Sequence, residues 1–171
     1  KMELLDTERP VAIQIYGSAE DSMERAAAMA QEAGADFIDI NCGCWVKKIA
    51  SRGDGAGLLR DLPRFEKVVR SVLKGTTLPV TVKTRLGWDK DSIVILDVAR
   101  MLEGLGVAAL TVHCRTRVQG YSGVADWAWA HYLQARDLLE EARRGKAQLE
   151  QALEDLARAN VQLTRFNKLA Q

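Results

Sequence analysis

The chemically richest stretch of the chain follows a short apolar run and contains an amide, a thiol and two cations: Asn41, Cys44, Lys47 and Lys48. The run at residues 37–40 is suited to a β-strand, and Gly43 supplies backbone freedom where the chain leaves that strand. Such a strand presents Cys44 at its carboxyl end, the edge at which ligands bind in parallel α/β folds. The pattern therefore predicts a functional site at Cys44, with a small buried thiol in a turn as the alternative.

Three further apolar runs, at residues 11–15, 80–82 and 108–112, carry polar side chains at or just beyond their ends. These side chains are Gln14, Lys83, Arg85, His113 and Arg115. Because parallel strands end at one edge of a sheet, we expect all of them to lie near Cys44. Taken singly, Lys83 could extend along an apolar surface to reach water, and His113 could be a hydrogen-bonded core residue.

Helical periodicity predicts three helices between these runs, over residues 23–33, from Asp61 onward, and over residues 91–105. Ser18 and Asp21 mark the start of the first helix, and Gly34 marks its end. Pro63 falls in the first turn of the second, and Gly106 ends the third. Strands that alternate with helices in this way predict the α/β class with a parallel sheet.

Cations gather at the predicted strand ends, although the formal net charge is only +1. They are Lys47, Lys48, Arg52, Arg85, Arg115 and Arg117. A positive local field of this kind suits a polyanion or a phosphate-bearing cofactor. The glycine-containing segment 53–57 is not followed by the Lys-Ser/Thr pair of a P-loop, so it does not match that nucleotide-binding fingerprint.

The composition is that of an ordinary soluble protein, with 171 residues, 47% of them hydrophobic and 27% charged. No apolar run approaches the ~20 residues of a membrane span. Residues 1–10 do not resemble a signal peptide, although a chain that begins at Lys1 can have lost its start. Three cysteines without secretory features predict reduced thiols and a cytoplasmic location. The spacing of Cys42 and Cys44 argues against a metal site.

Five ordered blocks carry a resemblance to one family: residues 11–17, residues 34–41, the turn around Cys44, residues 79–88 and residues 110–117. Over residues 8–127 the chain is similar to the tRNA-dihydrouridine synthases, flavin enzymes built on a (β/α)8 barrel. The resemblance implies reduction of the C5–C6 double bond of uridine in tRNA, which yields 5,6-dihydrouridine. FMN would deliver hydride to C6, a cysteine would deliver a proton to C5, and NADPH would be the reductant.

The resemblance also implies a role for each predicted site residue. Cys44 would be the general acid, and it must keep its proton although the neighbouring cations favour a thiolate. Asn41 and Arg85 would hold the uracil edge, since an amide both donates and accepts and a guanidinium can fork onto a carbonyl. The flavin contacts would come from Gln14, Lys83, His113 and Arg115. RNA phosphates would meet Lys47, Lys48 and Arg52.

Two features near the predicted site have more than one interpretation. Residues 51–57 have the composition of a mobile lid, although their glycines also permit a wide structural turn. Trp45 stands where the family more commonly has proline, so the turn after Cys44 is less rigid. The indole of Trp45 could stack on a base or pack under the lid.

The resemblance covers four of the eight strands of the family's barrel. We therefore expect residues 1–127 to form a half-barrel domain with two open sheet edges and an exposed apolar inner face. The family's loops for the FMN phosphate belong to the strands that are missing here. The chain by itself is expected to bind FMN weakly or not at all.

Residues 128–171 differ in composition, being rich in Ala, Leu, Glu, Gln and Arg, and predict one long helix. Leu149, Leu156 and Leu163 recur every seven residues, and Asn160 and Asn167 fall in the companion row. This heptad pattern favours a parallel coiled-coil homodimer, and it resembles the linkers that precede the kinase modules of bacterial sensor proteins. A helix folded back over the open half-barrel is the alternative.

Three functions therefore remain open on the sequence. The chain could be an FMN-dependent tRNA-modifying enzyme, or the central fragment of one. It could be a half-barrel without catalysis that serves as a dimerising or RNA-contacting module. It could also be an engineered or recombined fusion of barrel and coil, which the change of composition at residues 127–134 favours. No sequence feature indicates which uridine would be modified.

Overall fold

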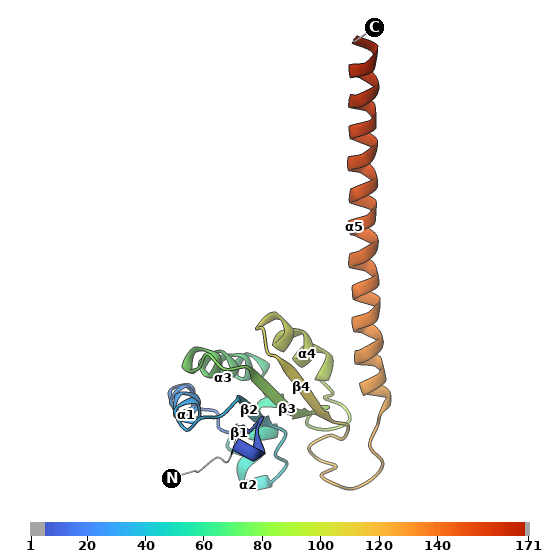
Figure 1. Cartoon of the computed structure of the whole chain (residues 1–171). Coiled ribbons are helices and arrows are strands. Elements are labelled where there is room, and N and C mark those ends of the chain that lie inside the picture. Colours follow the sequence, from blue (N-terminus) through green and yellow to red (C-terminus); the bar gives the residue numbers. More distant parts are fainter. Residues whose placement is uncertain (1–5, 170–171) are drawn as a thin grey trace. The chain divides into compact units, whose positions relative to one another are not determined.

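A computed structural model describes the backbone of residues 6–169 and the side chains of residues 7–135, 143–155 and 158. Its centre is a parallel sheet of four strands in the order β1-β2-β3-β4 (Figure 1). The strands are Ala12–Ile15, Phe37–Cys42, Val80–Arg85 and Ala109–His113. This sheet confirms the α/β class, and neighbouring parallel strands in chain order are consistent with part of a (β/α)8 barrel.

The second and third strands are longer than the sequence predicted. Asn41 pairs with Lys83 across β2 and β3, and Arg85 pairs with His113 across β3 and β4. These polar residues therefore belong to the strands themselves and do not follow them. Because side chains alternate along a strand, the four residues project from the same face of the sheet.

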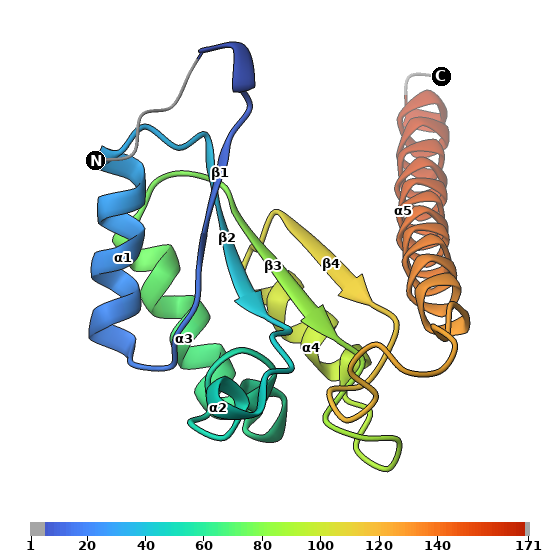
Figure 2. The same cartoon turned by 90° about the horizontal axis from the view of Figure 1, so that it is seen from below.

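Three helices, α1 (Glu20–Glu32), α3 (Leu62–Gly75) and α4 (Ile95–Gly104), cover the opposite face of the sheet (Figures 1 and 2). The core between the two layers contains Ile38, Ile40, Phe65, Val68, Val69, Val72, Val80 and Val82. Each of these side chains is at most 2% exposed. Burial on this scale makes the sheet a rigid support for the side chains at its carboxyl edge.

The helix start signals were right in one case and wrong in two. The carboxylate of Asp61 caps α3 by accepting a hydrogen bond of 3.1 Å from the backbone N–H of Arg64. Ser18 does not cap α1; its hydroxyl instead accepts a hydrogen bond of 3.0 Å from Nη2 of Arg64. The third helix begins at Ile95 and not at residue 91, because residues 89–92 form a hydrogen-bonded turn.

The face of the sheet away from the helices is polar, so the prediction of an apolar inner face is wrong. It carries Gln14, Asp39, Asn41, Thr81, Lys83, Thr111 and His113. The physical reason is the two-residue period of a strand, which turns the apolar residues of the same strands toward the helices. An apolar strip does remain open at the β1 edge, where Ile13 and Ile15 line a groove with Met29, which is 68% exposed.

Residues 51–57 do not form an open lid. The short helix α2 (Lys47–Ala50) leads through a turn into the 3-10 helix η2 (Gly55–Arg60), and residues 55–59 are buried. Gly57 lies so close to the backbone of Ala50 that a Cβ at position 57 would be 2.5 Å from the Ala50 carbonyl oxygen. The expectation of a mobile lid is therefore wrong for the buried residues, whose glycines serve the structural turn that the sequence also allowed.

The C-terminal part of the chain is one continuous helix, α5 (Ala128–Leu169), as the composition predicted. The chain divides into two compact units, Lys1–Trp129 and Ala130–Gln171. Within the described residues, no helix is both long enough and apolar enough to cross a membrane.

The described side chains of α5 in the range 143–155 are exposed, and they include two residues of the predicted coiled-coil seam. Leu149 is 62% exposed and Leu153 is 57% exposed. Asn160 and Asn167, which the coiled-coil prediction uses to set the register, lie outside the described side chains. The coiled coil therefore stays a prediction.

Candidate active site

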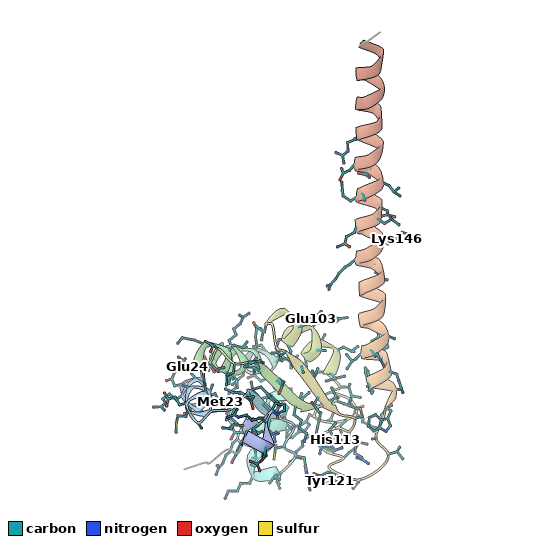
Figure 3. All side chains as sticks on the ribbon, viewed as in Figure 1. Met23, Glu24, Glu103, His113, Tyr121 and Lys146 are labelled. Atoms are coloured by element: carbon teal, nitrogen blue, oxygen red, sulfur yellow. The ribbon has the colours of Figure 1, made fainter. Side chains whose placement is uncertain are left out.

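A pocket of about 270 Å³ opens at the carboxyl ends of β2, β3 and β4. The side chains in its walls include Asn41, Cys44, Trp45, Lys83, Arg85, His113 and Tyr121. Figure 3 labels His113 and Tyr121, which lie together at this end of the sheet. The strand-end residues that the sequence singled out on β2, β3 and β4 thus meet at one place, because parallel strands share their carboxyl edge.

Of the three cysteines, Cys44 is the one that lines the pocket. Cys42 and Cys114 are buried, with exposed fractions of 0% and 2%. Burial, reinforced by the charge of Asp39, raises the pKa of the Cys42 thiol and makes it unreactive. The buried-thiol alternative therefore applies to Cys42 and Cys114, and Cys44 remains available for chemistry.

A chain of hydrogen bonds crosses the open face of the sheet and orients Asn41. Asn41 Nδ2 donates to Oε1 of Gln14 at 2.9 Å, and Gln14 Nε2 donates to Oδ2 of Asp39 at 2.6 Å. Thr81 Oγ1 donates to the second oxygen of Asp39 at 2.7 Å. The backbone N–H of Gly43 donates to Oδ1 of Asn41 at 3.1 Å. Asn41 is thereby fixed with one amide hydrogen left for a ligand.

Arg85 is buried, 2% exposed, and it ties together the loops that follow β2 and β4. Its Nε donates to the carbonyl of Gly43 at 2.9 Å, and its Nη1 donates to the carbonyls of Thr116 at 3.0 Å and Gly120 at 2.8 Å. Burial lowers the pKa of Arg85, although a guanidinium still keeps its proton. Arg85 therefore builds the pocket wall, and its Nη2 has no hydrogen-bond partner within the described residues.

His113 is held as a neutral imidazole. Nη1 of Arg115 lies 3.1 Å from Nε2 of His113, and a guanidinium can only donate, so this ring nitrogen must accept. Burial, followed by the charges of Arg85, Arg115 and Lys83, lowers the pKa of His113. Lys83 makes no hydrogen bond or ion pair within the part of the chain that the structure describes. The pocket thus places an unpaired ammonium close to a neutral imidazole.

Two aromatic rings complete the pocket. Trp45 and Tyr121 meet edge to face, with their centroids 5.6 Å apart and their planes at 81°. The indole also lies on Gly120, where a Cβ would be 3.2 Å from the ring and where φ is +56°. Trp45 therefore packs against the loop after β4, and it remains 40% exposed at the pocket mouth.

Some of the predicted residues do not line the pocket. Lys47 and Lys48 lie exposed on α2. Gln14 reaches the pocket only through its hydrogen bond to Asn41. Arg115 contacts His113 and also donates from Nε and Nη2 to the carbonyl of Gly123, at 3.2 Å and 3.0 Å. We infer that Gln14 and Arg115 position their neighbours.

Sequence reasoning missed two residues, Asp39 and Tyr121. Asp39 precedes Asn41 by two positions, so the strand period could have placed both on one face. Tyr121 lies in an irregular loop after β4, where no periodic signal marks a site residue. Only its contact with Trp45 and its distance of 6.0 Å from His113, between ring centroids, bring it into the pocket.

Comparison with known proteins agrees with this arrangement. The family model for dihydrouridine synthase matches residues 1–138. This match covers most of the chain and includes every residue of the pocket. The chain belongs to the dihydrouridine synthase family, which confirms the resemblance carried by the five sequence blocks.

Curated relatives from several bacteria match the same region. A probable tRNA-dihydrouridine synthase 1 of Synechocystis sp. is 45% identical over 128 residues, which cover 75% of this chain and 36% of that protein. A probable tRNA-dihydrouridine synthase of Rhizobium leguminosarum is 43% identical over 119 residues, covering 70% and 38%. The tRNA-dihydrouridine synthase B of Pasteurella multocida is 41% identical over 116 residues, covering 68% and 35%. The chain spans somewhat more than a third of the length of these relatives.

Proposed function

We propose that this chain forms part of the active site of a tRNA-dihydrouridine synthase, which reduces uridine in tRNA to 5,6-dihydrouridine. The observation that carries the proposal is the position of Cys44, the accessible thiol of the chain, in one pocket with Asn41, Lys83 and His113. In this role Cys44 donates the proton that C5 of the uracil receives. The thiolate left behind is stabilised by the cations around it.

FMN fits part of this site. Lys83 offers an unpaired cation and His113 a neutral ring on adjacent strands of the open polar face. The pocket of about 270 Å³ is smaller than the ~300–1,000 Å³ of typical ligand sites, so it can take a ring but not a whole flavin nucleotide. When bound, FMN would supply the hydride for C6 of the uracil, with NADPH as the source of electrons. Lys83 would hold the flavin by charge and His113 by hydrogen bonding.

The remaining pocket residues would orient the base. Asn41 has one amide hydrogen free after its bonds to Gln14 and Gly43, and this hydrogen suits a uracil carbonyl. Arg85 has its Nη2 edge free after its bonds to three carbonyls. Together they would set the ring with C5 toward Cys44. Lys47 and Lys48 on α2 would contact RNA phosphates beside the pocket.

The helix would have a separate, structural role. We place the barrel part at residues 1–127 and the helical part at residues 128–171. The exposed apolar side chains Leu149 and Leu153 support pairing of α5 with a second copy in a homodimer.

A segment exchange tests the catalytic proposal. Residues 1–127 of this chain would replace the matching segment of the Synechocystis relative, so that the rest of a barrel is present. The hybrid, supplied with FMN, NADPH and an unmodified tRNA transcript, should add two hydrogens to a uridine, as read by nucleoside mass spectrometry. Cys44→Ala should abolish the product, and Cys42→Ala, which removes a buried thiol, should retain it. A hybrid with full Cys44→Ala activity would overturn the role of this thiol.

A further inference from the structure

A second pocket, of about 350 Å³, lies beside the turn that joins α2 to η2. Its walls are Ala50, Ser51, Arg52, Gly53, Gly57, Arg60 and Arg64. The lining contains three guanidinium groups and no carboxylate. We call Arg52, Arg60 and Arg64 the arginine cleft. Three like charges gathered in one hollow raise the local potential and favour an anionic ligand.

The backbone of this turn is shaped to receive Arg64. Gly53 has φ of +87°, and a Cβ at this position would be 3.0 Å from Nη1 of Arg64. On its other side, Nη2 of Arg64 donates to the hydroxyl of Ser18 at 3.0 Å. The guanidinium is thus held in place by neutral partners, which leave its charge uncompensated. A fixed guanidinium loses little conformational entropy when it binds a ligand.

Arg60 is held by an aromatic ring. Its guanidinium lies 4.8 Å from the centroid of Trp88, and the guanidinium of Arg117 lies 4.6 Å from the same centroid. Stacking on a ring leaves the in-plane N–H groups of a guanidinium free to donate. Nε of Arg117 is buried and has no hydrogen-bond partner among the described residues. Arg60 thereby extends the positive surface from the cleft toward the loops after β3 and β4.

Nearby acidic groups neutralise this charge only in part. Asp61 is used by the cap of α3, where it accepts from the N–H of Arg64. The pKa of Asp89 is lowered by its hydrogen bond to Ser92 and, to a smaller extent, by the charge of Arg60. Arg52 is exposed and makes no hydrogen bond or ion pair within the described residues. The cleft therefore keeps donors that can fork onto phosphate oxygens.

The cleft and the Cys44 pocket share one wall. The N–H of Ala56 in η2 donates to the carbonyl of Cys44 at 3.1 Å, and Gly57, two residues after Gly55, lines the cleft. Resting on the proposed function, we propose that the arginine cleft binds backbone phosphates of the RNA strand whose uridine enters the Cys44 pocket. Phosphate contacts of this kind fix the register of a strand without reading its sequence.

Binding of RNA without catalysis tests this site. The 171-residue chain would be titrated into a 5′-fluorescein-labelled, unmodified tRNA transcript without FMN or NADPH, and anisotropy would be recorded at several salt concentrations. Arg52→Gln, Arg60→Gln and Arg64→Gln should each weaken binding about 5- to 10-fold at 0.1 M salt and lower the slope of log affinity against log salt by about one. Arg25→Gln and Arg70→Gln remove the same charge from exposed positions on α1 and α3 outside the cleft, and they should change binding less than twofold.

Three further readings make the outcome decisive. Loss of affinity should be the same on oligo-uridine and oligo-adenosine, whereas a loss confined to oligo-uridine would show base recognition and overturn a phosphate site. Arg52→Gln removes no printed contact, so an effect of this variant cannot come from misfolding; thermal melts check Arg60→Gln and Arg64→Gln. Cleft variants that bind like Arg25→Gln, or a chain that binds no tRNA, would overturn the proposal. Dihydrouridine formation by the hybrid with unaffected cleft variants would reject this site alone, and weakened binding without product would reject the catalytic proposal alone.

Discussion

Gly55 lies directly behind Cys44: a Cβ at position 55 would be 2.8 Å from the Cβ of Cys44 and 3.1 Å from its carbonyl oxygen. The φ of Gly55 is +54°, in the left-handed region that glycine tolerates best. The position of the thiol therefore depends on the absence of a side chain in η2.

Gly55→Ala should move Cys44 and destabilise the fold. The new methyl group must displace the backbone of Cys44, and the left-handed conformation adds strain, so we expect a loss of about 1–3 kcal/mol in the free energy of unfolding. Urea denaturation measures this loss. Gly104→Ala on α4, where nothing lies within 4 Å of the added methyl group, is the control and should not destabilise. Equal stability of the two variants would contradict the contact.

Cys44 should be alkylated before the other thiols. It lines the pocket, whereas Cys42 and Cys114 are buried and burial raises the pKa of Cys42. Limited iodoacetamide treatment of the native chain, followed by peptide mass spectrometry, should show label at Cys44 first. Labelling of all three in urea is the control for intrinsic reactivity. Equal rates in the native chain would mean that the pocket is not formed.

The lowered pKa of His113 should make the fold less stable in mild acid. Its folded pKa lies below the ordinary value of 6.5, so between these two values the unfolded chain binds the proton more readily and stability rises with pH. Denaturation midpoints should therefore fall as pH drops below about 6.5. His113→Gln should flatten this dependence, and His131→Gln is the matched control because the chain has only two histidines. An unchanged slope in His113→Gln would refute the shift.

The chain alone should retain little FMN. Lys83 and His113 can meet a flavin ring, but the pocket of about 270 Å³ leaves no room for the ribityl phosphate. Each missing charge-assisted hydrogen bond removes about 1.5–3 kcal/mol of binding free energy, which weakens affinity by orders of magnitude. Absorbance at the flavin band after gel filtration measures retention. Stoichiometric FMN would contradict this expectation, unless flavin content rises with protein concentration because two chains complete one site.

Removal of the helix should abolish self-association. Leu149 and Leu153 are exposed on α5, and pairing with a second copy would bury them. We expect light scattering to give a dimer for the whole chain and a monomer after truncation behind Trp127. Replacement of Leu149 and Leu153 by Gln is a milder variant and should weaken the dimer. A monomeric whole chain would reject the prediction.

Much of the fold could be predicted from short-range patterns. Asp61 and Pro63 mark the start of α3 because a cap and a first turn involve only neighbouring residues. The apolar runs mark the strands, and their parallel arrangement brings Asn41, Lys83 and His113 to one edge. These features depend on local geometry and on a general rule of parallel sheets, so a single sequence contains them.

The tertiary structure alone decided what several of these residues do. Arg85 binds the carbonyls of Thr116 and Gly120, which are 31 and 35 positions away, and so it became part of a wall. The buried turn at Gly55 and the cleft around Arg64 likewise depend on contacts with Cys44 and Ser18. Composition could not separate a lid from a packed turn, because the same glycines serve both. Long-range packing chooses between them, and no local pattern records which distant backbone will meet a given side chain.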